Sequence, residues 1–342
     1  MIDLSSDTAT RPSQGMREFM AKAPVGDEQR REDPTVNQLQ DLVAELTGKE
    51  AGLFLPSGTM CNAIAFTAHC ERGDAIIMDK WAHPNIAEGG GPALLAGAMV
   101  RSMDGERGVF TADQARVEIS SRGTHTSKTA LISVENTTNR GGGKIWPLER
   151  LAEMRALCDE HDMILHMDGA RLMNAVIGSG NSAKTFGSYV DTIWIDLSKG
   201  LGAPVGAVLA GPAEFIERAR LLKHRFGGAM RQAGVIAAAG LYAFEHNVER
   251  LAEDHANARL IQEGLKTIPG VKQMQGPVET NIVLFDVSET GKNSKEVEAK
   301  LEEQGVRMAP YVLPTWIRAV THLDVSREDC EKAVEALRIA VA

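Results

Sequence analysis

The sequence lacks paired cysteines, an excess of basic charge and long apolar runs. Its four cysteines (Cys61, Cys70, Cys158 and Cys330) are scattered without CxxC spacing, which argues against a disulfide framework or a zinc site and predicts no bound metal. The 37 basic residues are outnumbered by 46 acidic ones, giving a formal net charge of −9. This balance argues against nucleic acid or an anionic membrane as the main partner.

Signals for export or membrane insertion are also missing. The first residues, MIDLSSDTATRPSQ, carry acidic groups where a signal peptide needs a basic end and an apolar stretch. The longest mostly apolar run, AGVIAAAGLYAF, is rich in Gly and Ala and too short to span a bilayer. We therefore expect a soluble, cytoplasmic protein, with 342 residues sufficing for one large domain and a smaller one.

Short apolar runs alternate with helical patterns through most of the chain. The runs are AIIMD (75–79), TALISVEN (129–136), MILHMD (163–168), TIWIDLS (192–198) and VGAVLAG (205–211). They do not alternate polar and apolar residues, as expected for strands that are covered on both faces. Helical patterns between them, such as PLERLAEMRALCDEHD (147–162), predict a mostly parallel sheet with helices on both sides.

The chain divides into three parts by pattern. We expect an N-terminal arm over residues 1–15, a large domain over 16–245 and a small C-terminal domain over 246–342. In the last part, the strand candidates NIVLFDV and IRAVTHLDV alternate with two amphipathic helical stretches, which predicts a small α/β domain. A cleft between the two domains is the expected ligand site.

Two polar signals follow strand-like runs and fit the recognition of a charged ligand. Ser57, Gly58 and Thr59, in PSGTMCN, lie where a strand-like run turns into a helix. Such a helix N-terminus favours a phosphate, although a turn of this kind, taken alone, is more often an ordinary Ser/Thr N-cap. Asp168, in HMDGARL, ends an apolar run and either caps the next helix or holds the nitrogen of a heterocycle in its protonated form.

Two further signals concern a lysine and a histidine. Lys199, in WIDLSKGLGAPVG, is either a solvated turn residue or a former of Schiff bases, which requires a partly desolvated setting. The glycines Gly200 and Gly202 would let a cofactor approach the backbone closely. His83, in WAHPN, is a surface histidine or an aromatic plate against a planar ligand. Together with the phosphate turn and Asp168, these residues form the set that pyridoxal 5′-phosphate requires.

Long stretches of the sequence are similar to those of one enzyme family. They are DLSSDTATRPSQGMR, GDEQRREDPTVNQL, GLFLPSGTMCN, AHPNIAEGGG, SVENTTNRGGG, LHMDGARLMNA, LSKGLGAPVGAVLAG, GGAMRQAG and IRAVTHLDV. Through them the chain resembles the low-specificity L-threonine aldolases, a family of fold-type I (aspartate aminotransferase-like) enzymes that use pyridoxal phosphate. The resemblance covers nearly the whole chain and implies a large, mostly parallel sheet domain flanked by helices with a small C-terminal α/β domain.

The resemblance also implies how the cofactor is held. Lys199 would carry pyridoxal phosphate covalently, Asp168 would pair with its pyridine nitrogen and His83 would stack on its ring. The turn formed by Ser57, Gly58 and Thr59 would hold the phosphate. Lys223 and Arg231, in LLKHRFGGAMRQ, match basic positions that reach a phosphate across a subunit interface, which implies a homodimer or homotetramer.

For the substrate, the resemblance implies a cluster around the carboxylate and a base for the hydroxyl. Arg171 would lie near the phenolic oxygen of the cofactor and the substrate carboxylate, and Ser6 and Arg318 would complete carboxylate recognition. His83, or a water that it positions, would take the β-hydroxyl proton. His125, in SRGTHTSK, matches a second histidine near that hydroxyl, or is a plain loop residue.

The implied reaction is retro-aldol cleavage of L-threonine, L-allo-threonine or another β-hydroxy-α-amino acid to glycine and an aldehyde. The alternative is other pyridoxal phosphate chemistry on the same scaffold, such as β-elimination, racemisation or transaldol transfer. A dinucleotide-dependent dehydrogenase is disfavoured, because GLGAPVG does not have the GxGxxG spacing. A non-catalytic relative is disfavoured by the intact pair of Lys199 and Asp168.

The sequence departs from the family at the residues before its first strong helix. Gln29, Arg30 and Arg31 stand where the family usually has Val-Tyr-Gly, whose tyrosine borders the active site, often that of a neighbouring subunit. The two arginines are either solvated surface residues or a sign of a bulkier or anionic β-substituent, with Arg30 as a substrate-binding candidate. Thr138 likewise replaces a histidine, so the preference for threonine is in question.

Overall fold

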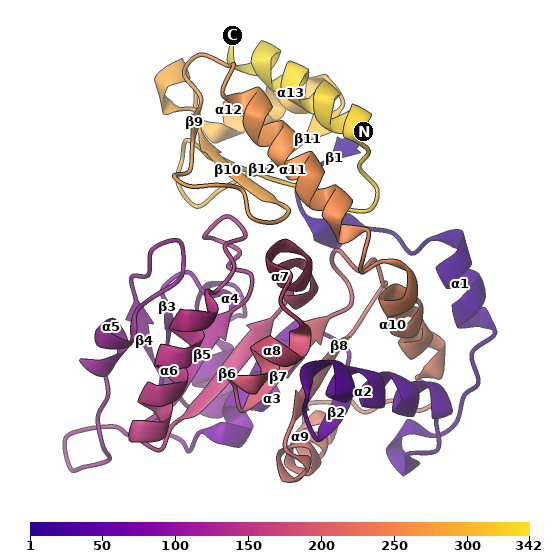
Figure 1. Cartoon of the computed structure of the whole chain (residues 1–342), viewed down its shortest axis with the longest axis vertical. Coiled ribbons are helices and arrows are strands. Elements are labelled where there is room, and N and C mark those ends of the chain that lie inside the picture. Colours follow the sequence, from indigo (N-terminus) through magenta and orange to yellow (C-terminus); the bar gives the residue numbers. More distant parts are fainter.

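The computed structural model describes all residues from Met1 to Ala342. Figure 1 shows two units along the long axis of the molecule, a large one built on a wide sheet and a small one that holds both chain ends. No helix has the length and apolar composition that crossing a bilayer requires.

The large unit contains a sheet of seven strands in the order β2-β8-β7-β6-β5-β3-β4. The strands are β2 (Ala51–Leu55), β3 (Ala75–Asp79), β4 (Met99–Met103), β5 (Thr129–Glu135), β6 (Ile164–Gly169), β7 (Thr192–Asp196) and β8 (Ala207–Gly211). Neighbours pair in parallel except β8, which is antiparallel to both β2 and β7. All five predicted runs are strands of this sheet, so the predicted fold class is confirmed.

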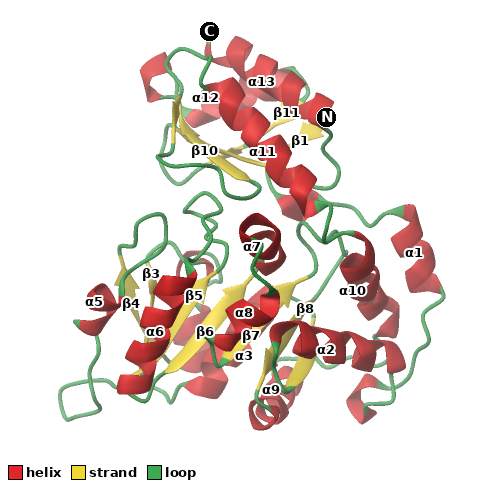
Figure 2. Ribbon diagram, in the orientation of Figure 1, coloured by secondary structure: helices red, strands yellow, loops and turns green.

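Helices cover both faces of the large sheet (Figure 2). The helices of the large unit are α1 (Gln14–Ala21), α2 (Pro34–Thr47), α3 (Gly58–His69), α4 (His83–Ile86), α5 (Ala112–Arg116), α6 (Leu148–Glu160), α7 (Leu172–Ser179), α8 (Ala183–Ser188), α9 (Ala213–Arg225) and α10 (Gly234–His246), and the N-terminal part also has the short turns η1 (Asp7–Ala9), η2 (Glu28–Arg30) and η3 (Pro92–Ala96). Because successive strand residues point to opposite faces, Phe54 joins the core under α2 and α6, whereas its neighbours Leu53 and Leu55 join the core under α3 and α9.

The small unit packs helices on an antiparallel sheet in the order β12-β13-β10-β9. Its elements are α11 (Leu251–Leu265), β9 (Lys272–Gln273), β10 (Ile282–Asp286), η4 (Ser288–Thr290), α12 (Ser294–Glu303), β11 (Val306–Arg307), β12 (Ala309–Pro310), β13 (Trp316–Val320) and α13 (Arg327–Val341). The first strand of the chain, β1 (Ile2–Asp3), pairs in parallel with β11. Leu4 lies in the core of the same unit. The first residues of the chain are therefore part of the small unit, whereas the helices and strands that follow them in sequence form the large unit.

Candidate active site

A cavity of about 370 Å³ lies at the carboxyl ends of β5, β6 and β7, against the N-terminus of α3. Nine of the thirteen residues proposed from the sequence line it. They are Ser6, Ser57, Gly58, Thr59, His83, Asp168, Arg171, Lys199 and Arg318. Because these residues come from six segments far apart in sequence, the fold alone brings them together.

The N-terminus of α3 faces the cavity with free donors. Ser57 is extended and its hydroxyl accepts a hydrogen bond from the Met60 N–H at 3.2 Å, so it is an N-cap as one interpretation predicted. The first N–H groups of a helix remain unpaired inside the helix and carry partial positive charge. A Cβ at Gly58 would clash with the ring of Trp194, and therefore glycine is required there. Capping and anion binding are compatible at this turn.

Asp168 is buried at the end of β6. Its Oδ2 accepts a hydrogen bond from the Asn62 amide at 2.9 Å, and its Oδ1 accepts one from the Ala170 N–H at 3.0 Å. Burial, together with the nearby charge of Glu135, raises the pKa of Asp168 to about 7. A cationic N–H placed against this carboxyl would relieve the cost of its burial, which is the environment that a protonated ring nitrogen needs.

His83 is held from two sides by carboxylates. Its Nδ1 lies 2.8 Å from Oε1 of Glu88, and its backbone N–H donates to Glu135 at 2.7 Å. The hydrogen bond to Glu88 raises the pKa of His83 above its ordinary value. Asn62 links this pair to the floor of the cavity, because its amide also donates to Glu88 at 2.9 Å. The Nε2 of His83 is left for a ligand.

We expect Glu88→Gln to lower the pKa of His83, because the variant replaces the negatively charged acceptor that favours the protonated ring by a neutral amide. If His83 acts as a base, the acidic limb of the pH profile of kcat/KM then moves to lower pH. The ring-proton NMR signal of His83 should titrate at lower pH in the same variant. Glu214→Gln, on the surface helix α9, is the control. An unmoved His83 signal would show that Glu88 does not control this ring.

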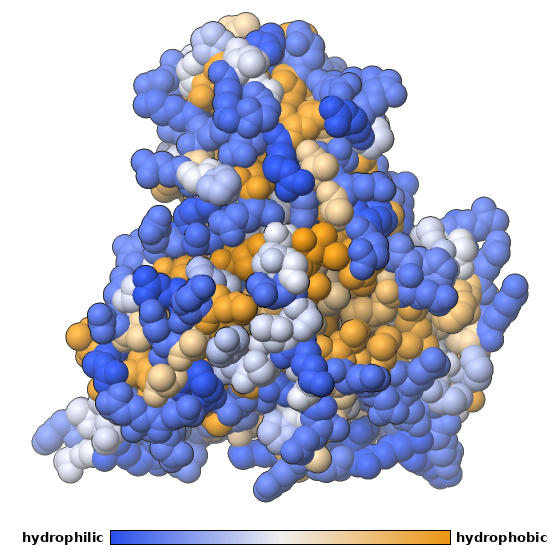
Figure 3. All heavy atoms as spheres, viewed as in Figure 1, coloured by the Kyte–Doolittle hydropathy of each residue, from blue (hydrophilic) through white to orange (hydrophobic).

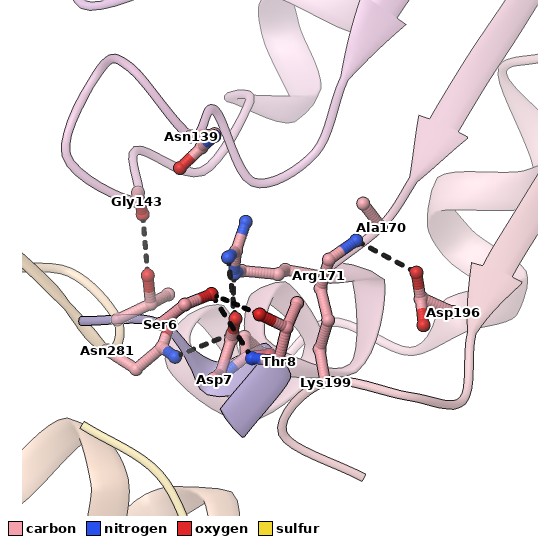
Figure 4. Close-up of polar contacts among 12 residues, drawn as sticks. Ser6, Asp7, Thr8, Asn139, Gly143, Ala170, Arg171, Asp196, Lys199 and Asn281 are labelled. Atoms are coloured by element: carbon pink, nitrogen blue, oxygen red, sulfur yellow. Dashed lines mark hydrogen bonds and ion pairs between the residues drawn. The ribbon is translucent and has the colours of Figure 1, made fainter. Parts of the chain in front are cut away.

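Lys199 lies after the end of β7 and points into the cavity. Its Nζ is 2.8 Å from Oδ2 of Asp196, whose Oδ1 is held by the backbone N–H of Ser198 at 2.7 Å (Figure 4). The side chain is only 19% exposed, so Lys199 is not a solvated turn residue. Of the two glycines after it, Gly200 faces Leu251, and Gly202 has a φ of 75°, a backbone conformation that favours glycine.

Arg171 is committed to a buried ion pair. Its Nε and Nη2 donate to the two oxygens of Asp7 at 2.7 and 2.8 Å, and Asn281 donates to Asp7 at 3.1 Å (Figure 4). Burial alone would raise the pKa of Asp7, but the charge and hydrogen bonds of Arg171 outweigh it and hold this pKa well below its ordinary value. Arg171 therefore reaches the cavity as a fixed cation, already bonded on one side.

Arg318 is different, because no carboxylate neutralises it. Its Nη1 donates to the Asn139 side chain at 2.7 Å and its Nη2 to the Ser5 carbonyl at 2.9 Å. Burial and the charge of Arg171 lower its pKa to about 10, so it is still protonated at neutral pH. An anionic group that enters the cavity would be stabilised here. Ser6, which directly precedes Asp7 in sequence, also lines the cavity.

Four proposed residues lie outside the cavity of this chain. Lys223 is buried between Glu28, with which it forms an ion pair, and the Phe54 carbonyl at 2.8 Å. Arg231 pairs with Asp27 at 2.9 Å and its side chain is 63% exposed. Lys223 is therefore buried and bonded to two acceptors within the subunit, whereas Arg231 faces solvent.

The other two are Arg30 and His125. The side chain of Arg30 is 73% exposed, and the neighbouring Arg31 pairs with Glu217 at 2.5 Å on the surface. His125 lies in an exposed loop before β5, at the edge of the sheet opposite the cavity, because the cavity adjoins the end of that strand at Glu135. Within one chain neither residue reaches the site.

Several polar residues of the site were not singled out from the sequence. They are Asp7, Asn62, Glu88, Glu135, Asn139 and Asp196. Two of them had a local signal: Asp196 precedes Lys199 by three residues, and Asn62 follows Gly58 by one helical turn, on the same face. The Asp7–Arg171 pair spans 164 residues and has no local signal.

The cavity residues fit pyridoxal phosphate. Its phosphate matches the free N–H groups at the N-terminus of α3 and the hydroxyls of Ser57 and Thr59. Its ring nitrogen matches Asp168, whose pKa is raised by burial and by the nearby charge of Glu135, so that a cationic N–H placed against it would be stabilised. Its aldehyde matches the amine of Lys199, held in the same cavity by Asp196.

Comparison with known proteins gives consistent results. Residues 3–290 match the family model described as beta-eliminating lyase. The chain is 42% identical to the low specificity L-threonine aldolase of Escherichia coli K12 over 343 residues, covering 100% of both chains. It is 36% identical to the low-specificity L-threonine aldolase 1 of Arabidopsis thaliana, covering 99% of this chain and 96% of that relative. The solved structure of Leishmania major threonine aldolase covers 100% of both chains with a TM-score of 0.85 at 20% identity, which shows the shared fold.

Proposed function

This chain belongs to the beta-eliminating lyase family and, by its full-length identity, to the low-specificity L-threonine aldolases within it, and from that premise we propose its reaction. It is a carbon–carbon lyase that uses pyridoxal phosphate to cleave L-threonine, L-allo-threonine or another β-hydroxy-α-amino acid to glycine and an aldehyde. The observation that carries the proposal is that Lys199, Asp168, the α3 N-terminus and the unneutralised Arg318 line one cavity.

Each residue has a task that its contacts support. Bound pyridoxal phosphate supplies an electron-withdrawing ring that stabilises negative charge at Cα. Lys199 provides the amine for the cofactor aldehyde, and Asp196 keeps that amine inside the cavity. Asp168 keeps the ring nitrogen protonated. The helix N-terminus at Gly58 binds the phosphate.

The substrate is positioned by the two arginines and by His83. Arg318 binds the α-carboxylate, and Arg171 supports it with a cation fixed by Asp7. His83 accepts the β-hydroxyl proton at Nε2, directly or through a water, because Nδ1 is bonded to Glu88. As that proton leaves, the Cα–Cβ bond breaks, the aldehyde departs and the electron pair remains at Cα. One proton from solvent then reaches Cα to give glycine, and His83 returns its proton to solvent.

The proposal includes a homodimer or homotetramer. Arg30 and Arg231 are exposed and outside the cavity of their own chain, as residues that serve a neighbouring site would be. Figure 3 shows an apolar area over α2 and α10, and a groove there is lined by Leu42, Leu241 and Phe244 among others. A second copy covers this groove. If light scattering gave the mass of a single chain, it would contradict the proposed homodimer or homotetramer.

The location of the protein in the cell belongs to the proposal as well. All four cysteines are free and buried, and burial raises the pKa of the Cys70, Cys158 and Cys330 thiols to about 12. Free thiols without partners fit a reducing compartment such as the cytoplasm. Fractionation of cells that produce the protein is the direct test.

The reaction is tested with a substrate panel. Purified enzyme with pyridoxal phosphate is expected to release glycine and the matching aldehyde in equal amounts from L-threonine, L-allo-threonine and L-phenylserine. Release of ammonia and a keto acid would point to β-elimination, and inversion without cleavage to racemisation. A protein that neither takes up the cofactor nor cleaves any of the three would contradict the proposal.

A further inference from the structure

A second cleft lies beside the cavity, between loops of the large unit and, in the small unit, Met274 and the connection from β12 to the start of β13. Its volume is about 190 Å³. Its lining includes Trp81, Arg140, Met274, Tyr311, Leu313 and Trp316. The chain has only four tryptophans and three tyrosines, and three of these seven side chains gather here. Aromatic walls of this kind accommodate a ring or an apolar chain.

Arg140 is the only charged group of this cleft that lacks a polar partner for its side chain. Its guanidinium lies over the Tyr311 ring, 4.7 Å from the ring centre, and its buried Nε has no hydrogen-bond partner. The adjacent Arg107, in contrast, donates to the carbonyls of Gly141 and Gly142 and pairs with Glu279. A half-buried cation without a partner costs free energy, and an anionic ligand group would remove that cost.

The cleft adjoins the place where the substituent on Cβ of the substrate would extend. Trp81 is two residues from His83, the proposed partner of the β-hydroxyl. Trp316 and Arg318 are two residues apart on β13, so their side chains point to the same face of the sheet. Asn139, next to Arg140 in sequence, accepts a hydrogen bond from Arg318 at 2.7 Å. The cleft therefore lies between the hydroxyl end and the carboxylate end of the proposed substrate.

Arg140 and Arg318, neither of which pairs with a carboxylate, are close enough for their charges to interact. The charge of Arg140 contributes to the lowered pKa of Arg318, after burial and Arg171. Burial raises the pKa of Tyr311 to about 12 against the opposing charges of Arg140 and Arg318. With one carboxylate bound at Arg318, the site still holds an unneutralised cation at Arg140. A substrate with a single carboxylate leaves that cation unused.

We propose that Trp81, Arg140, Tyr311 and Trp316 form a subsite, here termed the Arg140 subsite, for the distal end of the β-substituent. Its chemistry selects a substituent that ends in a carboxylate beyond an aromatic or apolar spacer. The aromatic side chains pack against the spacer, and the planar guanidinium binds the carboxylate by paired hydrogen bonds. This inference rests on the proposed retro-aldol function and names its substrate class: a β-hydroxy-α-amino acid with a second, distal carboxylate.

The test compares two substrates of the same shape, L-phenylserine and its 4-carboxy derivative. The wild-type enzyme is expected to prefer the carboxylated substrate in kcat/KM. Arg140→Gln should lower kcat/KM for that substrate by about 10- to 100-fold, the range of a charge-assisted hydrogen bond, mainly through KM. Phenylserine and threonine should change by less than about threefold. Arg116→Gln, which breaks a surface ion pair with Glu160, is the charge-matched control.

A binding measurement separates this inference from the reaction itself. With the holoenzyme saturated with glycine, so that Arg318 is occupied, calorimetry should show that 4-(hydroxymethyl)benzoate binds more tightly than 4-(hydroxymethyl)benzamide, and that Arg140→Gln removes the difference. Equal binding of the two probes, or equal kinetic losses on both phenylserines, would overturn the subsite while threonine cleavage stands. If no substrate is cleaved, the proposed function fails, and the calorimetric difference still decides on the subsite.

Discussion

Replacing Lys199 with alanine is expected to lower kcat/KM for β-hydroxy-α-amino acid cleavage by about 10⁴-fold or more. The variant removes the one amine in the cavity that is placed to bond the cofactor aldehyde, and it leaves Asp196 without its cation at 2.8 Å. Borohydride reduction of the wild-type holoenzyme should fix a pyridoxyl group on Lys199, which peptide mass analysis detects. The variant should carry no such mark.

Two further variants make this test specific. Lys199→Arg keeps a cation against Asp196 and should preserve the fold, yet it should be as inactive as the alanine variant. Lys295→Ala, in the first turn of α12 on the surface, should leave turnover unchanged. Turnover by Lys199→Ala near the wild-type rate, or a pyridoxyl mark on the buried Lys223, would refute the assignment.

The second large effect concerns stability. We expect Asp7→Asn to lower the free energy of unfolding by about 3–5 kcal/mol, because it leaves the buried guanidinium of Arg171 without its counter-charge. Urea unfolding measures the loss. Asp41→Asn, an exposed substitution on α2, should change stability by less than about 0.5 kcal/mol. A loss below about 1 kcal/mol for Asp7→Asn would mean that Arg171 finds another partner or water.

The pH dependence of this effect has a definite sign. The pKa of Asp7 is lower in the folded chain than its ordinary value of 3.8, so the unfolded chain binds the proton more readily. The contribution of the carboxylate to stability is therefore complete above pH 3.8 and is lost as the pH falls below it. The stability difference between wild type and Asp7→Asn should shrink only in that acidic range.

The sequence was most informative where a local pattern sufficed. The start and end of α2 follow from Asp33 as N-cap, Pro34 in the first turn and Gly48 with a φ of 68°. The predicted strands of the large sheet are buried and apolar, so they can be recognised as apolar runs from the sequence alone. Strand β4 escaped prediction because it lies at the sheet edge, where Met99 is 56% exposed and the run MVRSM has no clear pattern.

Contacts between distant segments could not be derived in this way. The stretch AGVIAAAGLYAFEHNVERLAEDHANARLIQEGLKTI (233–268) has a helical pattern throughout. It forms two helices, α10 and α11, because α10 ends at His246 and the Asn247 amide donates to the Leu201 carbonyl at 2.7 Å. Asn62 bonds to Asp168 and Glu88, and Glu88 bonds to His83. These contacts join segments that are far apart in sequence, so no local pattern predicts them. The role of Arg30 stays a prediction, since it depends on a neighbouring chain.

The pairing of β1 with β11 sets an order of events during synthesis. Ile2 leaves the ribosome first, yet its partner Val306 is made more than three hundred residues later, after roughly 15 to 60 s at about 5–20 residues per second. Until then the first ten residues have no sheet to join, and Thr10 cannot be held in place for its hydrogen bond to the Lys199 carbonyl. A growing chain can thus complete its large sheet early, whereas its catalytic cavity closes only when synthesis is nearly finished.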